Sequence, residues 1–390
     1  MIPANLPIQR PPDARVLVID PGGQIRSMLR SRFPMLLRPC DVVVANDAAT
    51  LPASMFGVHK RSGRSVELRL AGSESVSPDD VKRFSAVVFG EGDYRTPTEL
   101  RPSPPELRNG DALQLGPLTA TVLQLLGHPR LVMIRFEGPS AHIWECLARY
   151  GRPIQYSHIP VPLAVWDTWT PIAGPPVAFE PPSAGFALDW RTIDTIRRLG
   201  VHFATITHAA GLSSMGDEEL DARLPFDEPY RIPHSTARSI RLARMAGGRV
   251  IAIGTTVVRA LEHSVSVHGS VCETIDRANN KIVPATDLHV VNAVLSGAHE
   301  PGTSHHKLLA AFMDQPTLLR MDQALQHHHY RAHEFGDSVF VEKSRNRESS
   351  QVTGSIWAAT QRPRVLSVCQ EARKHEATDF ENHARSFTKV

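Results

Sequence analysis

Residues 246–262, AGGRVIAIGTTVVRALE, form the segment best suited to binding a ligand. The pattern predicts a helix that stops at two glycines, then a buried strand, then a new helix that opens at Gly254, Thr255 and Thr256. The first turn of a helix has free N–H groups and the positive end of the helix dipole, so this junction is suited to binding a phosphate or a carboxylate. Thr255 or Thr256 fits a plain helix N-cap equally well, and both interpretations stay open.

Other polar side chains lie where chemistry is expected, but each has a simpler interpretation. Arg259 and Glu262 are three residues apart and share a face of the predicted helix, where a weak surface ion pair is the simpler reading. Asn46 and Asp47 end a predicted strand, a common place for ligand-binding groups in α/β proteins, although both residue types also favour turns. Glu67 lies in the strand-like run SVELRL, where a solvent-facing position is the simpler interpretation.

The histidines are the remaining candidates for acid–base or metal chemistry. His208 ends a predicted strand and is followed by Ala-Ala-Gly, so its side chain either faces a cleft or has a purely structural role. A second group invites a metal site: His299, His305, His306 and the run 327–329. These residues do not have the H-E-x-x-H spacing, and no carboxylate stands at a matching offset, so we expect no metal ion.

The elements that must position these residues follow an alternating order. Short apolar runs closed by turn residues predict buried strands at 15–20, 42–45, 201–208 and 249–254. Helical patterns cover 24–33, 141–151, 188–200, 235–248, 255–265 and 305–313. Strands that alternate with helices indicate βαβ units and a mostly parallel sheet, so the fold class is α/β.

Residues 58–140 have a different pattern of apolar and turn residues. Five short, often alternating runs follow one another there, separated by turn residues and without a helix of useful length, which is typical of a small β-barrel or sandwich. The predicted organisation is therefore a discontinuous α/β domain, 1–57 and 141–342, with an inserted domain at 58–140. Residues 343–390 are polar and lack periodicity, which predicts a disordered tail.

Bulk properties narrow the class of protein. The 390 residues are 42% hydrophobic with a net charge of +3, a globular composition without the excess of basic residues typical of nucleic-acid binders. The four cysteines form no C-x-x-C pair, so free thiols are expected, with neither zinc ligation nor a disulfide framework. The N-terminus has no apolar signal core, and no run of about 18 apolar residues exists. A cytoplasmic protein without a membrane span is expected.

Taken in order, several segments resemble one known family. They are RVLVID, LLRPCDVVVANDAATLPASMFG, VELRL, PPSAGF, GGRVIAIGTTVVRALE, HEPGTS, AAF and YRAHEFGDSVF, which together cover roughly residues 15–342. The chain is similar to the S-adenosylmethionine:tRNA ribosyltransferase-isomerases of queuosine synthesis. The resemblance implies an α/β domain in two chain segments with a β-barrel inserted between them. It also implies a reaction in which S-adenosylmethionine, as co-substrate, gives its ribosyl group to a 7-deazaguanine base of tRNA, which yields epoxyqueuosine.

The resemblance also implies roles for the candidate residues. Two sets match the family pattern: Asn46, Gly254, Thr255, Thr256, Arg259 and Glu262 for donor binding, and Asp47, Glu67, His208 and His299 for catalysis. The glycine–threonine turn and Arg259 are expected to hold polar groups of the donor, including its carboxylate. Asp47 or Glu67 is expected to orient ribose hydroxyls or to take a proton, and the two histidines are candidates for proton transfer.

Departures from the family pattern leave the acceptor open. Most of them remove a basic residue, as at Ala49, Ser54, Ala187 and Gly302. Because basic side chains contact phosphates, these losses and the low net charge favour a small, non-tRNA acceptor as an alternative to tRNA. A non-catalytic paralogue is a third hypothesis, which the retained Gly-Thr-Thr turn disfavours. The expected partners are a nucleoside donor and the acceptor, and the expected state is a monomer.

Overall fold

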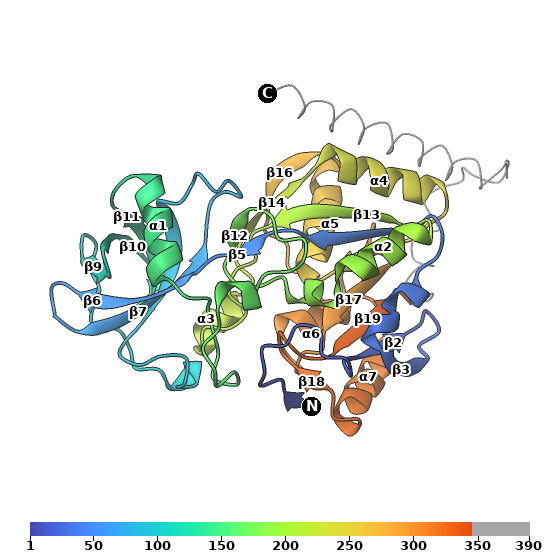
Figure 1. Ribbon diagram of the computed structural model, residues 1–390, viewed down its shortest axis with the longest axis horizontal. Coiled ribbons are helices and arrows are strands. Elements are labelled where there is room, and N and C mark those ends of the chain that lie inside the picture. Colours follow the sequence, from blue (N-terminus) through green and yellow to red (C-terminus); the bar gives the residue numbers. More distant parts are fainter. Residues whose placement is uncertain (345–390) are drawn as a thin grey trace.

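The computed structural model describes residues 1–344, and nearly all of the predicted tail at 343–390 lies outside this range. Figure 1 shows two parts side by side: a β-barrel with one flanking helix, and a larger part in which helices cover a central sheet. The same figure places β4, in the blue N-terminal segment, inside the larger part, and the chain returns there after the barrel. The α/β class with an added barrel, predicted from the sequence, is confirmed.

The large sheet has nine strands in the order β16-β14-β13-β4-β15-β17-β19-β2-β3. Its four central strands, β13, β4, β15 and β17, run parallel, whereas the strands toward both edges include antiparallel pairs. The bounds in chain order are β2 Arg15–Ile19, β3 Ile25–Leu29, β4 Val42–Asn46, β13 His202–His208, β14 Glu228–Ile232, β15 Val250–Ile253, β16 Thr274–Ala278, β17 Ala293–Gly297 and β19 Ser338–Glu342. The sheet is therefore mixed, with a parallel centre.

Alternating side chains of the central strands build a core on each face of this sheet. Val42 and Val44 pack with α4 (His234–Met245), α5 (Thr255–His268) and α7 (Gln315–His327). Val43 and Ala45 point to the other face, against α2 (Trp190–Arg198) and the 3₁₀-helix η1 (Arg30–Leu36). Because both faces are covered, β4 is buried along its whole length, as expected for a central parallel strand.

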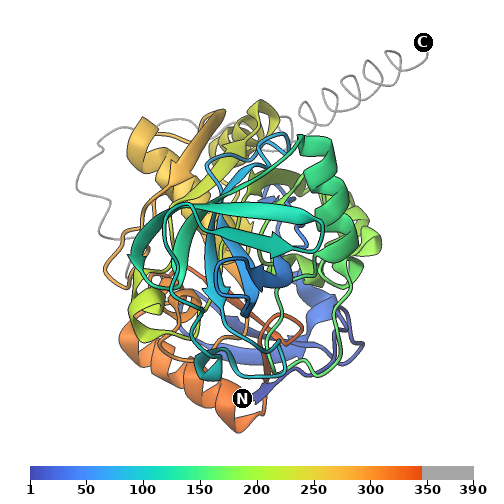
Figure 2. The same cartoon turned by 90° about the vertical axis from the view of Figure 1, so that its left-hand side faces the viewer.

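The barrel is closed and has six strands, in the order β10-β11-β8-β7-β6-β9 (Figure 2). Their bounds are β6 Ser54–His59, β7 Ser65–Gly72, β8 Arg83–Phe89, β9 Ala112–Leu115, β10 Leu118–His128 and β11 Leu131–Phe136. The helix α1 (Ser140–Tyr150) packs on the barrel through Ile143 and Leu147. The division of the chain at residues 58 and 140 stays a prediction.

The remaining elements of the described chain are short. They are β1 Ile2–Pro3, β5 Ala49–Thr50, η2 Thr98–Leu100, η3 Val165–Asp167, β12 Pro176–Ala178, η4 Ser183–Ala187, α3 Glu218–Arg223, α6 Ser304–Leu309 and β18 Arg331–Ala332. Leu212, Met215 and Leu220, from the segment around α3, belong to the apolar core of the barrel. This segment therefore fixes the barrel against the end of the large sheet.

One expected helix and the expectation for one cysteine are wrong. The helix predicted at 24–33 is the strand β3 followed by η1, because the Pro-Gly-Gly turn, with Gly23 at a φ of 76°, folds this segment back onto β2 as a hairpin. Cys146 and Cys272 are free thiols, but Cys40 is disulfide-bonded, so the expectation of free thiols fails at that residue.

Among residues 1–344, no helix combines the length and apolar character that crossing a bilayer requires.

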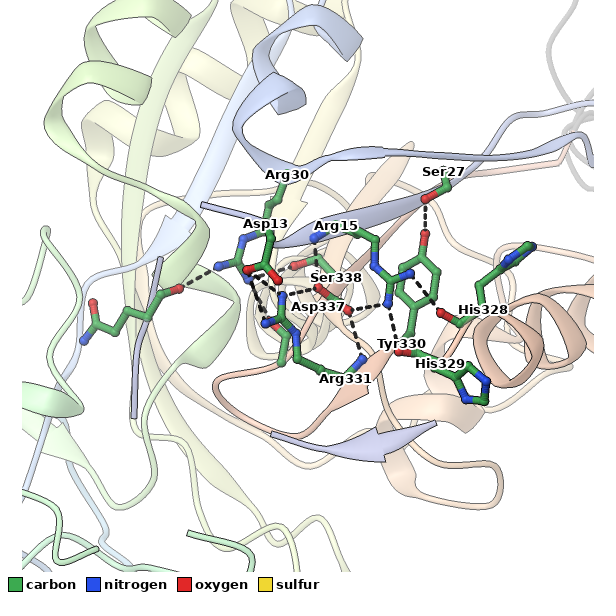
Figure 3. Close-up of polar contacts among 12 residues, drawn as sticks. Asp13, Arg15, Ser27, Arg30, His328, His329, Tyr330, Arg331, Asp337 and Ser338 are labelled. Carbon is green, nitrogen blue, oxygen red and sulfur yellow. Dashed lines mark hydrogen bonds and ion pairs between the residues drawn. The ribbon is translucent and has the colours of Figure 1, made fainter. Parts of the chain in front are cut away.

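A buried carboxylate fixes the far edge of the sheet (Figure 3). Asp337 accepts hydrogen bonds from the backbone N–H groups of Arg15 at 2.8 Å and Arg331 at 2.9 Å, and both guanidinium groups pair with it. The Arg15 guanidinium lies 4.1 Å from the ring centre of Tyr330, whose hydroxyl contacts Ser27. The contacts of Tyr330 and Asp337 hold β2, β3 and β19 together.

Candidate active site

A cavity of about 730 Å³ opens at the carboxyl edge of the central strands. Residues that directly follow β13, β15 and β17 line it, as do parts of segments 180–184, 221–228, 281–283 and 299–308. Because these three strands run the same way with β4 between them, their C-terminal ends meet at one edge, where open α/β sheets bind ligands. The volume of the cavity is in the range of small-molecule sites.

The predicted glycine–threonine turn lies at this edge. Gly254 is the N-cap of α5 with a φ of 97° and a ψ of 154°, and no side chain caps the helix. Neither Thr255 nor Thr256 is therefore the N-cap, and both line the cavity. The start of a 14-residue helix thus faces the cavity with its free N–H groups and positive dipole end.

Gly254→Ala is expected to destabilise the fold and to weaken ligand binding. An added Cβ would strain the positive φ by about 1–3 kcal/mol and would lie 3.4 Å from Ala184 in the cavity wall. Thermal unfolding and ligand titration measure the two effects. Gly247→Ala is the matched control, since its φ is 73° but its Cβ meets no atom within 4 Å. Equal ligand affinity in both variants would contradict a binding role for the turn.

Arg259 and Glu228 form a buried ion pair in the cavity wall. Arg259 Nη1 donates to Glu228, and its other nitrogens donate to the carbonyl oxygens of Phe226 at 3.1 Å, Ala278 at 2.9 Å and Asn280 at 3.3 Å. Glu228 also accepts from the Gly211 N–H at 2.6 Å. Burial raises the Glu228 pKa, which the Arg259 charge opposes. The guanidinium is therefore committed to protein partners, and the pair shapes the wall.

His208 lies behind this pair rather than in the cavity wall. It is fully buried, stacks on Tyr230 and has Nε2 at 3.6 Å from a Glu228 oxygen. Within the described chain neither ring nitrogen has a hydrogen-bond partner. Burial, with the nearby Arg259 charge, holds the His208 pKa well below its ordinary value, so the ring is neutral at pH 7. His208 can therefore influence the cavity only through Glu228, which it contacts.

His299 is the predicted catalytic residue that lies in the cavity itself. It stacks on His305 with the ring centres 4.2 Å apart, and both residues line the cavity. Burial lowers the His299 pKa well below its ordinary value and lowers the His305 pKa to about 4. Both imidazoles are therefore neutral at pH 7, and a neutral imidazole can accept a proton at one ring nitrogen and donate a hydrogen bond from the other. Within residues 1–344 no group of three or more His, Cys, Asp or Glu side chains is placed to hold a metal ion.

Asn46 and Asp47 end β4 but are withdrawn from the cavity. The Asn46 side chain exchanges two hydrogen bonds with the His208 backbone, at 2.9 Å each, which joins β4 to β13. Asp47 accepts from the Thr207 hydroxyl at 2.7 Å, and burial raises its pKa. The backbone of Gly174 donates to the Asp47 carbonyl, and β12 pairs in parallel with β5, so the 174–180 segment runs beside the residues that follow β4.

Glu67 and Glu262 are buried in other places. Glu67 lies on β7 of the barrel, paired with Arg69 and Arg101, and it is buried rather than exposed to solvent. Glu262, on α5, accepts backbone N–H bonds from residues 289, 290 and 291 at 2.7, 3.0 and 2.9 Å, which fixes the loop that precedes β17. The surface ion pair between Arg259 and Glu262 does not form in the described structure, because each has other partners.

The sequence analysis missed several residues of the cavity wall. They are Glu180, Ser183, Asp221, Glu228, Lys281 and Lys307, whereas His305 is considered in the sequence analysis only as a metal ligand. These residues lie in loops, in short helices or at a strand start, where no periodic pattern marks them. Glu228 could have been found from the sequence, because it and Arg259 both match the family pattern and their opposite charges suggest an ion pair.

Relatives of known description are similar to this chain along most of its length. The S-adenosylmethionine:tRNA ribosyltransferase-isomerase of Thiobacillus denitrificans is 28% identical over 350 residues, which cover 88% of this chain and 96% of that protein. The protein of the same name from Citrifermentans bemidjiense is 29% identical over 345 residues, covering 87% and 95%. A crystal structure of the S-adenosylmethionine tRNA ribosyltransferase from Thermotoga maritima aligns with a TM-score of 0.45 and 20% identity, covering 87% of this chain and 94% of that one.

The sequence model of one family spans almost the whole described chain. Its description is "Queuosine biosynthesis protein", and it matches residues 2–341, from the first strand to the last strand of the large sheet. The resemblance found in the separate sequence segments is thereby confirmed as a continuous match. This chain, with its barrel and its ligand cavity at the sheet edge, belongs to the queuosine biosynthesis protein family.

Proposed function

We propose that this chain transfers the ribosyl group of S-adenosylmethionine to the 7-deazaguanine base of a tRNA and isomerises it, which forms epoxyqueuosine. The observation that carries the proposal is the cavity, where the α5 N-terminus, the Glu228–Arg259 pair and His299 come together. The relatives named S-adenosylmethionine:tRNA ribosyltransferase-isomerase, 28–29% identical over most of this chain, support the same reaction.

The charges around the cavity suit a donor that has both a carboxylate and a purine. The free N–H groups of the first turn of α5 favour an anion, and Lys281 and Lys307 add two cations to the wall. We assign the donor carboxylate to this region, with Thr255 and Thr256 as hydroxyl partners. The wall beside His299 and His305 offers stacked neutral rings instead, which suits the uncharged parts of the nucleoside.

The roles proposed for the predicted residues follow from their distances to this cavity. His299 is the predicted proton-transfer residue with direct access to the donor. Arg259 and His208 act through Glu228, which they contact. Asn46, Asp47, Glu67 and Glu262 hold strands and loops in place, and in this proposal they do not touch a donor bound in the cavity.

The proposal also includes the setting of the reaction. Because the cavity is built entirely by one chain, a monomer is sufficient for donor binding. A tRNA acceptor implies the cytoplasm as the site of action. The barrel, fixed beside the cavity by the segment around α3, is the part of the molecule placed to contact the rest of the tRNA.

Two measurements test the proposed function. Isothermal titration of the purified chain with S-adenosylmethionine should show binding at one site, and adding tRNA that carries the 7-deazaguanine precursor should release adenine. Binding without tRNA-dependent adenine release would identify a different acceptor, such as a small molecule. No binding would remove the proposal and favour a non-catalytic paralogue.

A further inference from the structure

Glu180 is a cavity residue that the roles given above do not use. It follows β12 and lines the cavity with 8% of its surface exposed. One carboxyl oxygen, Oε2, accepts the backbone N–H of Ser213 at 3.0 Å. The other, Oε1, is hydrogen-bonded to the hydroxyl of Tyr156. The carboxyl group therefore has a fixed place in the wall and two neutral partners.

The hydroxyl of Tyr156 has two oxygen neighbours but only one proton. Its oxygen lies in contact with Glu180 Oε1 and at 3.1 Å from the carbonyl oxygen of Ser214. When the phenol donates to the carbonyl, the contact with Glu180 is completed by a proton on the carboxyl group. When Glu180 is ionised, the phenol proton turns to the carboxylate instead. Both protonation states of Glu180 are thus accommodated by rotating one O–H bond.

The surroundings bring the two states close in energy. Burial raises the Glu180 pKa to about 7, and the Glu334 carboxylate adds to this, whereas the hydrogen bonds from Tyr156 and Ser213 oppose it. Glu334 is paired with His158 at 3.0 Å. Burial, with the nearby Glu180, raises the Tyr156 pKa well above its ordinary value, so the phenol keeps its proton.

Other charged groups face the same space. Arg69, from the barrel, lies 5.8 Å from the ring centre of Tyr156. The ionisable residues that line the cavity with Glu180 are Asp221, Glu228, Arg259, Lys281, His299, His305 and Lys307. The Arg259 charge is paired with Glu228, and the two histidines are neutral at pH 7. Glu180 is therefore the carboxyl group of this wall whose hydrogen-bond partner, the Tyr156 hydroxyl, accommodates both the protonated and the ionised form.

We propose that Glu180 is the general acid of the reaction and delivers its proton to the departing adenine. This inference rests on the proposed function. As the bond between the ribose C1′ and adenine N9 breaks, its electron pair moves to the adenine ring, and a lone pair of the ribose oxygen attached to C1′ forms a C=O bond in its place. A ring nitrogen of adenine takes the proton of Glu180, and Tyr156 turns its O–H toward the carboxylate that is left. Water protonates Glu180 again after the product leaves.

The charges in the cavity wall suit different parts of the donor. The α5 N-terminus and the two lysines attract an anion and hence the donor carboxylate. Oε2 accepts from Ser213, so the proton of the neutral carboxyl group lies on Oε1, and it can turn from Tyr156 toward an acceptor nitrogen of the purine ring. Leaving groups of poor stability require protonation as they depart, which is the task of a general acid with a pKa near the working pH.

Glu180→Gln separates proton transfer from binding. The amide keeps the size of the side chain, donates to the Tyr156 oxygen and accepts from Ser213, but it has no proton to give up. We expect S-adenosylmethionine to bind Glu180→Gln as tightly as it binds the parent chain. The rate of tRNA-dependent adenine release should fall about 100-fold or more. Adenine release at the parent rate, or loss of donor binding together with release, would overturn the assignment.

The pH dependence gives a second readout. A general acid acts in its protonated form, so the parent rate should fall as the pH rises through about 7. Tyr156→Phe removes a hydrogen bond that lowers the Glu180 pKa, so this fall should move to higher pH. A rate that increases through the same range would make Glu180 a base and overturn the proposal. If the parent chain itself releases no adenine, the proposed function has failed and not this inference alone.

Discussion

Arg259→Ala is expected to lower the free energy of unfolding by about 3–5 kcal/mol at pH 7. Arg259 is 5% exposed and gives hydrogen bonds to Glu228 and to three backbone carbonyl oxygens. Its removal leaves the Glu228 carboxylate buried without a cation. The carbonyl oxygens of Phe226, Ala278 and Asn280 lose a donor at the same time, and each lost partner of a buried group adds to the cost.

The double variant Arg259→Ala with Glu228→Gln is the control for this prediction. It removes the unpaired charge, so it should recover part of the stability that the single variant loses. Burial already raises the Glu228 pKa, and loss of Arg259 raises it further. The single variant should therefore regain stability as the pH falls and Glu228 takes up a proton.

Urea unfolding measures the stability effect, and donor titration separates it from binding. We expect the folded fraction of Arg259→Ala to bind S-adenosylmethionine more weakly, because the cavity wall around Glu228 moves. Full stability together with abolished binding would contradict the structural role and restore Arg259 as a direct ligand of the donor. Full stability with unchanged binding would remove both roles.

The frame of the fold is predictable from short sequence runs. Val42–Asn46 and Val250–Ile253 are continuous apolar segments closed by turn residues, and they form central parallel strands that are buried on both faces. The amphipathic pattern around Ile193 and Ile196 places α2 on the sheet for the same reason. The sequence also places Gly254 at a strand–helix junction, because an apolar run directly precedes it and a helical pattern directly follows it.

Side-chain direction and loop packing are not contained in these runs. In SVELRL the apolar residues Val66, Leu68 and Leu70 face the barrel core, as their alternation predicts. Glu67 lies on the opposite face of β7, which is also buried, so the interpretation of Glu67 as solvent-facing is wrong. Asn46 ends the predicted strand, but its partner is the backbone of His208, 162 residues away. Glu180 lies in the cavity because the 174–180 segment pairs with residues 47–51, which follow β4, and no local pattern encodes that pairing.

Glu67→Ala is expected to destabilise the protein by at least about 3–5 kcal/mol while leaving donor binding intact. Glu67 Oε1 accepts from Arg69 Nε at 2.7 Å and from the Ser54 hydroxyl at 2.8 Å, and Oε2 pairs with Arg101. Both arginines are 2% exposed and lie over Phe89. Alanine leaves two buried guanidinium groups without a carboxylate, in an apolar setting where their repulsion is poorly screened.

Acid should weaken the same cluster in the parent chain. Burial alone raises the Glu67 pKa, but Arg69 and Arg101 outweigh it and the pKa is lowered below its ordinary value. A carboxyl group with a lowered pKa in the folded state contributes stability above its unfolded pKa, and this is lost as the pH falls through the folded value. Glu67→Ala should therefore unfold in less urea than the parent at pH 7, with the difference shrinking in acid.

Glu106→Ala is the matched control for Glu67→Ala, because Glu106 pairs with Arg108 on the exposed side of the same part of the chain. A surface pair of this kind contributes about 0–1 kcal/mol, so the control should unfold close to the parent. Titration with S-adenosylmethionine below the unfolding transition decides the role of Glu67. Unchanged affinity supports a purely structural carboxylate, because the cavity wall does not include Glu67. Lost affinity with parent-like stability would instead place Glu67 in contact with the donor, as the family resemblance implied.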